Sequence, residues 1–535
     1  MKFGFIIDQR KCIGCHACTT ACKAEHQVPV GVNRTWVKQV EKGEFPNTRR
    51  LFSVMRCNHC TDAPCVDICP TQALFVRDDG IVDFNNDRCI GCKSCMQACP
   101  YDALYIDPES NTAAKCNYCA HRVDVGLEPA CVNVCPEHAI ISGDMDNPDT
   151  EISQLLSRQQ VKVRKPEKGT SPNVYYIDAD DLTLVPEATE KSDAYYWNSQ
   201  SLGVGHFAKE AEKMANANLD LVSEVMKLEN PNPPKSSAPV KSVEVLMNKG
   251  KRTYDSPDKG ILWGWEVSAY VWTKAISAGA FILPFIMWVT GIAEFDSPFV
   301  WIGMAISTAF LGITGLLLIK DLDRPDRFLY VLLRPQWSSW LVRGGYAISV
   351  FGALVAAIGL SSFFKLSFEW LMWPACIFSV IVATYTAFLF AQAKGRDFWQ
   401  SPTLAIHMLV HSIMAGAAVF VTLTLFIESS TEVLQLLKSV ILGTIAINLI
   451  TISSELMTTH PTNDSKNTVS LILKGRYKNL FWLGMIMLGN ALPFLLVLIS
   501  GSSLILTSIA SLFILIGLYI TEHIWVEAPQ RISLS

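Results

Sequence analysis

Four groups of four cysteines occupy the first quarter of this 535-residue chain and decide how that part of it can fold. Groups one and three read C-x2-C-x2-C-x3-C, whereas group two widens the middle gap to four residues and group four widens it to eleven. In chain order the groups are Cys12, Cys15, Cys18 and Cys22; Cys57, Cys60, Cys65 and Cys69; Cys89, Cys92, Cys95 and Cys99; Cys116, Cys119, Cys131 and Cys135.

This spacing is typical of [4Fe–4S] clusters, in which three close thiolates hold one cluster and a fourth reaches the other cluster of a pair. Structural zinc also uses C-x2-C pairs, but zinc ribbons do not usually add C-x3-C-P. A disulfide framework suits a secreted chain, and the segment before Cys12 contains no apolar signal region. We therefore expect four [4Fe–4S] clusters and keep zinc as the main alternative.

An internal repeat supports the cluster interpretation. The pattern C-P-x-x-A-[LI] starts at Cys69, Cys99 and Cys135. Proline after the last ligand ends a cluster loop, because it fixes φ and removes a hydrogen-bond donor. Cys22 is followed by Lys23 instead, which predicts a different exit of the chain from the first group.

The distances along the chain predict which groups share clusters. Groups two and three are separated by 19 residues, as in a two-cluster ferredoxin, so groups one and four become partners by elimination. The exchange of fourth ligands then gives four sets. They are Cys12, Cys15, Cys18 and Cys135; Cys116, Cys119, Cys131 and Cys22; Cys57, Cys60, Cys65 and Cys99; Cys89, Cys92, Cys95 and Cys69.

The second half of the chain has the composition of a membrane protein. It holds 29 charged residues in 266–535, against 65 in 1–265. Eight apolar runs are long enough to cross a bilayer, and Pro284, Pro374 and Pro493 are expected to kink three of them. The predicted spans are 267–293, 298–319, 342–364, 370–392, 402–427, 433–456, 479–500 and 503–525.

The expected fold is an α+β double ferredoxin-like iron–sulfur domain followed by an all-α eight-helix transmembrane bundle. The domain takes residues 1–190, with strand-forming sequence at 172–186. A soluble linker takes 191–260, including a possible helix at 205–228 and a Pro-rich segment at 230–239. The bundle takes 261–535.

The charges in the loops predict the orientation. Lysine and arginine gather after spans two, four and six, while the alternate loops carry mostly acidic residues. By the positive-inside rule, the basic loops, both termini and the cluster domain are expected in the cytoplasm of a cell with the bundle in its inner (plasma) membrane. With 45 basic and 49 acidic residues, the charge gives no reason to expect nucleic acid as a partner.

Both halves resemble known families. The cysteine spacing of the first 190 residues is similar to that of the four-cluster iron–sulfur subunits of DMSO and polysulfide reductases. The second half resembles the NrfD/PsrC polysulfide reductase membrane subunits, and Asp323 stands where that family usually has glycine. The residues that carry this second resemblance are Asp321-Leu-Asp-Arg-Pro-Asp-Arg-Phe328, Leu333-Arg-Pro335 and Ser339-Trp-Leu-Val-Arg-Gly344.

The resemblance implies a fusion of two subunits that transfers electrons between menaquinone or ubiquinone and a separate large catalytic subunit, often a molybdopterin enzyme. The chain itself has no molybdopterin motif and no G-x-G-x-x-G loop after a strand. Catalytic chemistry beyond the clusters is therefore expected on a partner. A proton-translocating module, or an anchor without a quinone site, is the alternative function.

Quinone chemistry needs hydrogen-bonding and titratable groups at membrane depth near a cluster. Glu266, Tyr270 and Lys274 share one face of span one, beneath the cluster domain. In the polysulfide reductase family, polar residues four apart on the first helix line the quinone pocket. The alternative is that Glu266 and Lys274 lie at the membrane interface.

Spans five, six and eight add further polar residues. His407 and His411 lie four residues apart and suit a proton path or quinone contact, an interhelical hydrogen bond, or less well a haem. Glu455 suits proton transfer or the membrane interface. The remaining expectations place Glu522 and His523 at the interface, use Asn448 and Asn490 between helices, and bury Cys376 as an apolar residue.

Overall fold

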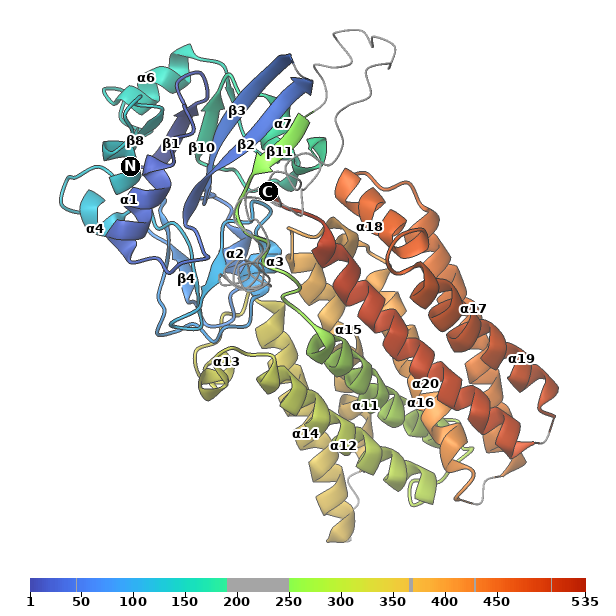
Figure 1. Ribbon diagram of the computed structural model, residues 1–535. Helices are drawn as coiled ribbons and strands as arrows, with labels where there is room; N and C mark the ends of the chain where they lie inside the picture. Colours follow the sequence, from blue (N-terminus) through green and yellow to red (C-terminus); the bar gives the residue numbers. More distant parts are fainter. Residues whose placement is uncertain (45, 190–249, 365–368, 428–429, 502) are drawn as a thin grey trace, which may run out of the picture.

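In the computed structural model, a strand-rich domain stands on one end of a helical bundle (Figure 1). The structure describes residues 1–44, 46–189, 250–364, 369–427, 430–501 and 503–535. Eight helices in these ranges are long and apolar enough to cross a membrane, so the predicted fold class is confirmed. The predicted helix at 205–228 and the Pro-rich segment at 230–239 lie outside the described residues.

Two sheets and two hairpins build the cluster domain. Strand orders are β8-β1-β10-β9 and β11-β2-β3, and β4-β5 and β6-β7 are the hairpins. β1 runs parallel to β10 and antiparallel to β8. The strands are β1 (Phe3–Asp8), β2 (Thr35–Glu44), β3 (Asn47–Arg56), β4 (Leu74–Val76), β5 (Val82–Phe84), β6 (Tyr105–Asp107), β7 (Thr112–Ala114), β8 (Ile140–Asp144), β9 (Val161–Lys162), β10 (Val174–Ile177) and β11 (Gly250–Tyr254).

Two of these strands bear on the predicted boundaries. β10 falls within the strand-forming segment 172–186. β11 pairs antiparallel with β2, although its residues belong to the predicted linker 191–260. The last part of that segment therefore completes a sheet of the cluster domain. Its sequence, GKRTY, lacks the apolar alternation that identifies a strand.

The C-P-x-x-A-[LI] repeat adopts one backbone turn at all three positions. Gln72, Asp102 and His138 occupy the same place in the repeat and have positive φ values of 54°, 57° and 48°. The chain then enters β4, β6 and β8. The short helices of this domain are α1 (Ala17–His26), α2 (Pro64–Asp67), α3 (Ser94–Ala98), α4 (Ala120–Val123), α5 (Ala130–Asn133), α6 (Glu151–Arg158), α7 (Asp181–Leu184), η1 (Pro166–Lys168) and η2 (Pro186–Ala188).

The first cysteine group has the different exit that its missing proline predicts. Helix α1 carries Cys18 and Cys22 and continues without interruption to His26. A proline after Cys22 would have stood inside this helix, where its ring clashes with the preceding turn.

The bundle is centred on α11 and α16, whose span residues are 83% and 72% buried. The segment Leu480–Ala491 is a π-helix (η7), which the sequence gives no means to predict, and Pro493 follows it at the start of α19. The other elements are α11 (Trp265–Val289), α12 (Pro298–Lys320), η4 (Pro325–Arg327), α13 (Tyr330–Leu333), α14 (Trp340–Phe363), η5 (Glu369–Leu371), α15 (Met372–Gln392), η6 (Asp397–Gln400), α16 (Leu404–Leu423), α17 (Thr431–Met457), α18 (Asn463–Leu473), α19 (Leu492–Ile499), α20 (Leu504–Glu527) and η8 (Ala528–Arg531).

Buried polar contacts join the cluster domain to the bundle. Arg396, between α15 and η6, donates from Nε to Gln97 Oε1 at 3.0 Å and from Nη1 to the carbonyl of Ile532 at 2.6 Å. Gln97 in turn donates to Gln530 Oε1 at 2.6 Å. These side chains satisfy one another's hydrogen-bonding groups at a buried contact, which fixes the two halves of the chain relative to each other.

The loop after α12 makes a second contact. Asp323 pairs with Lys93 at 3.0 Å, and the backbone of Gly91 lies so close to it that an added Cβ would be 2.7 Å from the Asp323 Cβ. Arg327 donates to the carbonyl of Asn86 at 2.7 Å. The aspartate that departs from the usual glycine thus forms an ion pair with the cluster domain, and the basic residues of this loop dock on that domain as well as setting the loop charge.

Candidate functional site

The cysteines gather in the four predicted sets. One cavity is lined by Cys12, Cys15, Cys18 and Cys135, and another by Cys69, Cys89, Cys92 and Cys95. In the other two sets the thiols are near enough to interact electrostatically: Cys22 with Cys116, Cys119 and Cys131, and Cys57, Cys60 and Cys65 with Cys99. Each set contains one cysteine from a distant group, as the exchange of fourth ligands requires. Metal ligation by these thiols stays a prediction.

Buried cations stand beside the thiols. Arg56 donates from Nη1 to Cys131 Sγ at 3.2 Å and lies over the ring of Phe5. Its Nε and Nη2 are buried and have no hydrogen-bond partner among the described residues. Burial raises the pKa of the Cys131 thiol, and the Arg56 charge opposes that increase. A buried guanidinium with unused donors fits a site that holds negative charge.

Burial acts on the other thiols in the same direction. It raises the pKa of Cys18 to about 12 and that of Cys92 to about 12. Thiols with such values stay protonated at neutral pH, and they become ligands when a metal displaces the proton. Lys115, buried beside Cys57, lowers the pKa of that thiol against the dominant effect of burial.

A mostly apolar cavity of about 190 Å³ lies between the cluster domain and the bundle. Cys92 forms part of its wall, together with Ile90 and Ser94. The bundle contributes residues of α11, α12, α13, α14 and α15 and of the loop after α12, among them Val267, Tyr270, Gly315, Asp321, Tyr385 and Leu389. The cavity is smaller than the roughly 300–1,000 Å³ of sites that enclose a whole ligand, so it suits a ring headgroup with a tail outside.

The predicted face of α11 divides between two environments. Tyr270 is buried and lines the cavity. Lys274, also buried, donates to Thr386 Oγ1 at 2.6 Å and lies 4.7 Å from the centre of the Tyr385 ring, one layer behind the cavity wall. Glu266 lies at the end of the helix, 3.8 Å from Lys320 Nζ, and does not line the cavity.

Asp321 is a polar wall residue that the sequence identifies only as part of the family motif after span two. It follows the last residue of α12, just outside the span. Burial raises its pKa to about 7, the nearby Glu266 and Asp323 add to the increase, and Lys93 opposes it. A carboxyl group with this pKa takes up and releases a proton near neutral pH.

A second cavity, of about 670 Å³, lies where η6, α16, α17 and α20 meet the cluster domain. We call it the vestibule; its lining includes Lys168, Asp397, Glu455, His460 and Trp525. Lys168 and Asp397 form an ion pair across it, between the cluster domain and η6. Glu455, from the end of α17, thus stands where the vestibule meets the bundle core.

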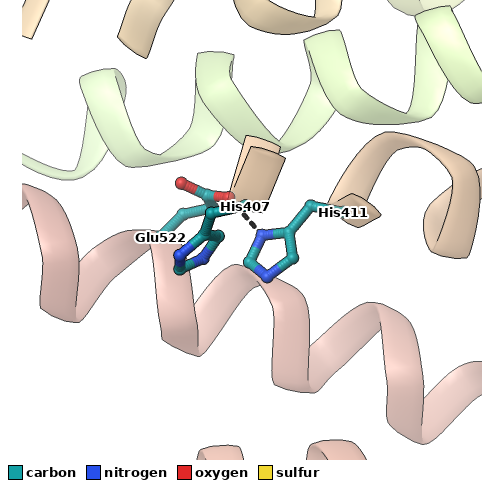
Figure 2. Close-up of side chains that lie close together, drawn as sticks. All are labelled: His407, His411 and Glu522. Carbon is teal, nitrogen blue, oxygen red and sulfur yellow. Dashed lines mark hydrogen bonds and ion pairs between the residues drawn. The ribbon is translucent and has the colours of Figure 1, made fainter. Parts of the chain in front are cut away.

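The two histidines belong to a buried chain of polar side chains that starts at Glu455, and contact between the two rings joins its two hydrogen-bonded parts. His407 Nδ1 lies 3.0 Å from Glu455 Oε2, and the rings of His407 and His411 are 4.2 Å apart. Figure 2 shows Glu522 of α20 pointing at these rings, with His411 Nδ1 2.7 Å from Glu522 Oε1. His411 Nε2 is 3.1 Å from Asn448 Oδ1.

Glu522 is a member of this chain that sequence reasoning missed. The prediction of an interfacial position was wrong, because the side chain is 4% exposed and bonded to His411. Its distance from the end of α20 suggested the interface, whereas η8 and the cluster domain cover that end. Asn448 and Asn490 do join helices as predicted, since Asn448 Nδ2 donates to Asn490 Oδ1 at 3.0 Å.

Three possible metal ligands come together here. One ring nitrogen each of His407 and His411 and one carboxylate oxygen of Glu522 lie within 4.8 Å of one another, which is close enough to hold a metal ion. Both ring nitrogens of His411 are engaged with protein oxygens, however. A metal ion or a haem at His411 would have to displace one of these bonds. The arrangement fits a hydrogen-bonded chain better than a ligand set.

Family models match both halves of the chain, over residues 11–145 and 256–530. A 4Fe-4S dicluster domain matches residues 48–145 and a second 4Fe-4S dicluster domain matches 11–74. The model described as polysulphide reductase, NrfD, matches residues 256–530. The chain therefore has [4Fe–4S] domains and a membrane domain with multiple spans.

Curated relatives match about a third of the chain. A tetrathionate reductase subunit of Salmonella typhimurium is 46% identical over 189 residues, which are 35% of this chain and 76% of the relative. A polysulfide reductase subunit of Wolinella succinogenes is 41% identical over 181 residues, 33% of this chain and 94% of the relative. Protein NrfC of Escherichia coli is 44% identical over 181 residues, 33% of this chain and 81% of the relative.

Proposed function

We propose that this chain, which belongs to the polysulphide reductase NrfD family, connects membrane quinone to a catalytic subunit. The proposal is supported by its dicluster domains, which are similar to those of reductase iron–sulfur subunits. The chain is an electron-transfer subunit anchored in the membrane by its own second half. The proposal adds a quinone, four [4Fe–4S] clusters and a molybdopterin partner to that description.

One observation carries the quinone proposal. Cys92, a predicted cluster ligand, and Tyr270, Tyr385 and Asp321 line the same cavity. Trp263 donates from Nε1 to the carbonyl of Cys92 at 3.1 Å, which ties the ligand loop to the entrance of α11. A ring bound there would contact the wall of a cluster site directly, without a protein layer between them.

The sixteen cysteines would hold the clusters in the four predicted sets, and the clusters when bound supply one-electron transfer. Arg56 and Lys115 offset the negative charge of the sets that they face. Cys15 is exposed just before α1, and nearby Ile13 is 55% exposed. We place the contact with the catalytic subunit at this exposed surface.

The wall residues have separate tasks in quinone chemistry. Apolar side chains such as Val267 and Leu389 exclude water from the ring. The hydroxyl groups of Tyr270 and Tyr385 are suited to hydrogen-bond its oxygens, and Asp321 is suited to exchange one proton. The basic loops after α12, α15 and α17 support a cytoplasmic cluster domain. A cysteine in the loop between α12 and η4, labelled by an impermeant reagent in spheroplasts, would contradict that orientation.

Gly315 gives a direct test of the cavity. It lines the cavity, and open space surrounds the position of its missing Cβ. We expect Gly315→Leu to slow re-oxidation of the dithionite-reduced chain by menaquinone about tenfold or more, because the new side chain takes the place of the ring. Stopped-flow absorbance of the clusters in nanodiscs measures the rate.

Gly312→Leu is the matched control, on the same helix three residues earlier. Open space surrounds this glycine too, but it does not line the cavity. We expect its rate to stay within twofold of the original. Equal rates in both variants and the original chain would favour the anchor without a quinone site.

Asp321 predicts a pH dependence. Its pKa of about 7 means that the carboxylate form, which accepts a proton from a quinol, dominates above pH 7. The rate of quinol oxidation should therefore rise as pH increases through about 7, and Asp321→Asn should remove this step and lower the plateau about tenfold or more. A pH–rate profile from pH 5.5 to 9 in both proteins measures it; an unchanged step in the variant would contradict the assignment.

A further inference from the structure

Resting on the proposed quinone function, we propose a one-sided proton conduit that leads from the vestibule to Lys274 behind the quinone cavity. It is formed by Glu455, His407, His411 and Glu522. It serves the proton that Asp321 does not take. The conduit ends inside the bundle and does not cross the membrane.

The outer part of the conduit consists of hydrogen bonds and one wider step, from His407 to the pair of His411 and Glu522. Glu455 lines the vestibule, so its side chain can be reached from that cavity. Thr403 and Trp525 each donate to that carboxylate, at 2.9 Å, and hold it in place toward His407. One ring nitrogen of His407 lies within 4.8 Å of a ring nitrogen of His411 and of a carboxylate oxygen of Glu522. Each step is short enough for a proton to pass directly or through one water molecule.

A chain of amides fixes where the mobile proton sits. Asn490 Nδ2 donates to the carbonyl of Met485 in the π-helix, and Asn448 Nδ2 donates to Asn490 Oδ1. The oxygen of Asn448 must then face His411, so Nε2 of that ring is a donor. Only the proton between His411 Nδ1 and Glu522, 2.7 Å apart, is free to move from one group to the other.

The inner part leads to the cavity. The charges of Glu522 and Lys274 interact, although no direct hydrogen bond joins the two side chains in the described part of the chain. Lys274 donates to Thr386, which also interacts with the hydroxyl of Tyr270 on the cavity wall. Hydroxyl groups pass a proton by accepting one and donating another, so Tyr270 and Thr386 connect the ring to Lys274.

Beyond this level, the described parts of the four central helices contain no buried titratable side chain. The helices α11, α16, α17 and α20 meet there in an apolar core that includes Ala280, Met414, Ile441 and Ile514. Among the described residues, the buried ionisable side chains of these four helices are Tyr270, Lys274, His407, His411, Glu455 and Glu522. All of them lie in the half of the bundle next to the cluster domain, since α11 and α16 begin there and α17 and α20 end there.

The reaction balances with two proton routes. A quinol that becomes a quinone gives up two electrons and two protons. The electrons go to the one-electron carriers of the cluster domain, Asp321 takes one proton, and the neutral amine of Lys274 takes the other. Lys274 then passes its proton to the pair of Glu522 and His411. From this pair the proton moves to His407, then to Glu455, and finally to the vestibule. Quinone reduction uses the same steps in reverse.

Glu455→Gln tests the outer step. Glutamine keeps the shape and can still accept from Trp525, while the hydroxyl of Thr403 can accept from its amide. In proteoliposomes with menaquinol and external ferricyanide as electron acceptor, we expect quinol oxidation to slow about tenfold or more. The solvent isotope effect should increase, and external formate should restore part of the rate because it replaces the lost carboxyl group from the vestibule.

Three further measurements decide the proposal. Glu522→Gln should act like Glu455→Gln but without formate rescue, because Glu522 does not line the vestibule. Glu527→Gln, on the same helix but paired with Arg531, is the control and should stay within twofold. A pH indicator should report both protons of each quinol on the cluster-domain side and none in the opposite compartment.

Each outcome bears on a different claim. Unchanged rates and isotope effects in Glu455→Gln and Glu522→Gln, with normal quinol oxidation, overturn the conduit alone. Protons on the opposite side overturn its one-sidedness and favour proton translocation. A chain that passes electrons from dithionite to ferricyanide but never oxidises menaquinol overturns the quinone function and the conduit together.

Discussion

Cys92→Ser is expected to abolish electron exchange between menaquinone and the cluster domain. Cys92 lines the site of the predicted set Cys69, Cys89, Cys92 and Cys95 and also the cavity where we place the quinone ring. A serine hydroxyl is a poor ligand for this soft-metal site. Iron content should fall from about sixteen to about twelve atoms per chain, and one signal should disappear from the EPR spectrum of the reduced protein.

Cys376→Ser is the control for this experiment. Cys376 lies in α15, far along the chain from the four groups, and is half-buried. Iron content and electron transfer should remain as in the original chain. A Cys92→Ser protein with sixteen iron atoms and full menaquinone activity would contradict both the ligand set and the position of the quinone.

Gly279→Leu is expected to prevent the membrane half from folding. A Cβ on Gly279 would lie 1.9 Å from the carbonyl oxygen of Ser412 on α16, and one on Gly416 would lie 2.4 Å from the Gly279 backbone. The two central helices therefore touch through their backbones. Overpacking of a core by a few methylene groups costs about 1–3 kcal/mol, and here rigid backbone opposes a whole side chain.

The yield of monodisperse protein in detergent, together with its thermal unfolding temperature, measures the effect. Gly443→Leu on α17 is the control, since open space surrounds the Cβ position of that glycine. We expect Gly279→Leu to give almost no folded protein and Gly443→Leu to behave normally. A stable, active Gly279→Leu protein would show that α11 and α16 do not pack as closely as the structure places them.

The elements that the sequence predicts well are those encoded by strong local patterns. The cysteine spacing determines the sets that the structure brings together, and apolar length determines the eight spans. The repeated turn at Gln72, Asp102 and His138 follows from the same proline motif. In each case the signal lies within a short stretch of chain, so no knowledge of distant contacts is needed.

The features that the sequence does not predict depend on contacts between distant segments. Glu522 stands near the end of a helix, and only the packing of α16 against α20 shows that it bonds to His411. The π-helix, which positions Asn490, has no known local signature in its sequence. β11 pairs with β2, although the two strands lie far apart in the sequence. Asp321 is a loop charge in the sequence and a cavity wall in the structure.

The departure at Asp323 illustrates how a sequence difference can be explained once the contact is visible. The family usually has glycine there, and an aspartate raises the question of whether the turn changes. In the structure the Asp323 side chain forms an ion pair with Lys93. The facing residue is Gly91, and because it has no side chain it leaves room for Asp323. The glycine required at this approach is thus supplied by the cluster domain.

Titration of the fully reduced chain with menaquinone tests the central claim, that quinone and clusters exchange electrons within this one polypeptide. Four one-electron clusters should reduce about two menaquinone molecules per chain, with the cluster absorbance recovering in step. Dithionite-reduced chain that stays reduced in the presence of menaquinone, yet is re-oxidised at once by ferricyanide, would contradict it.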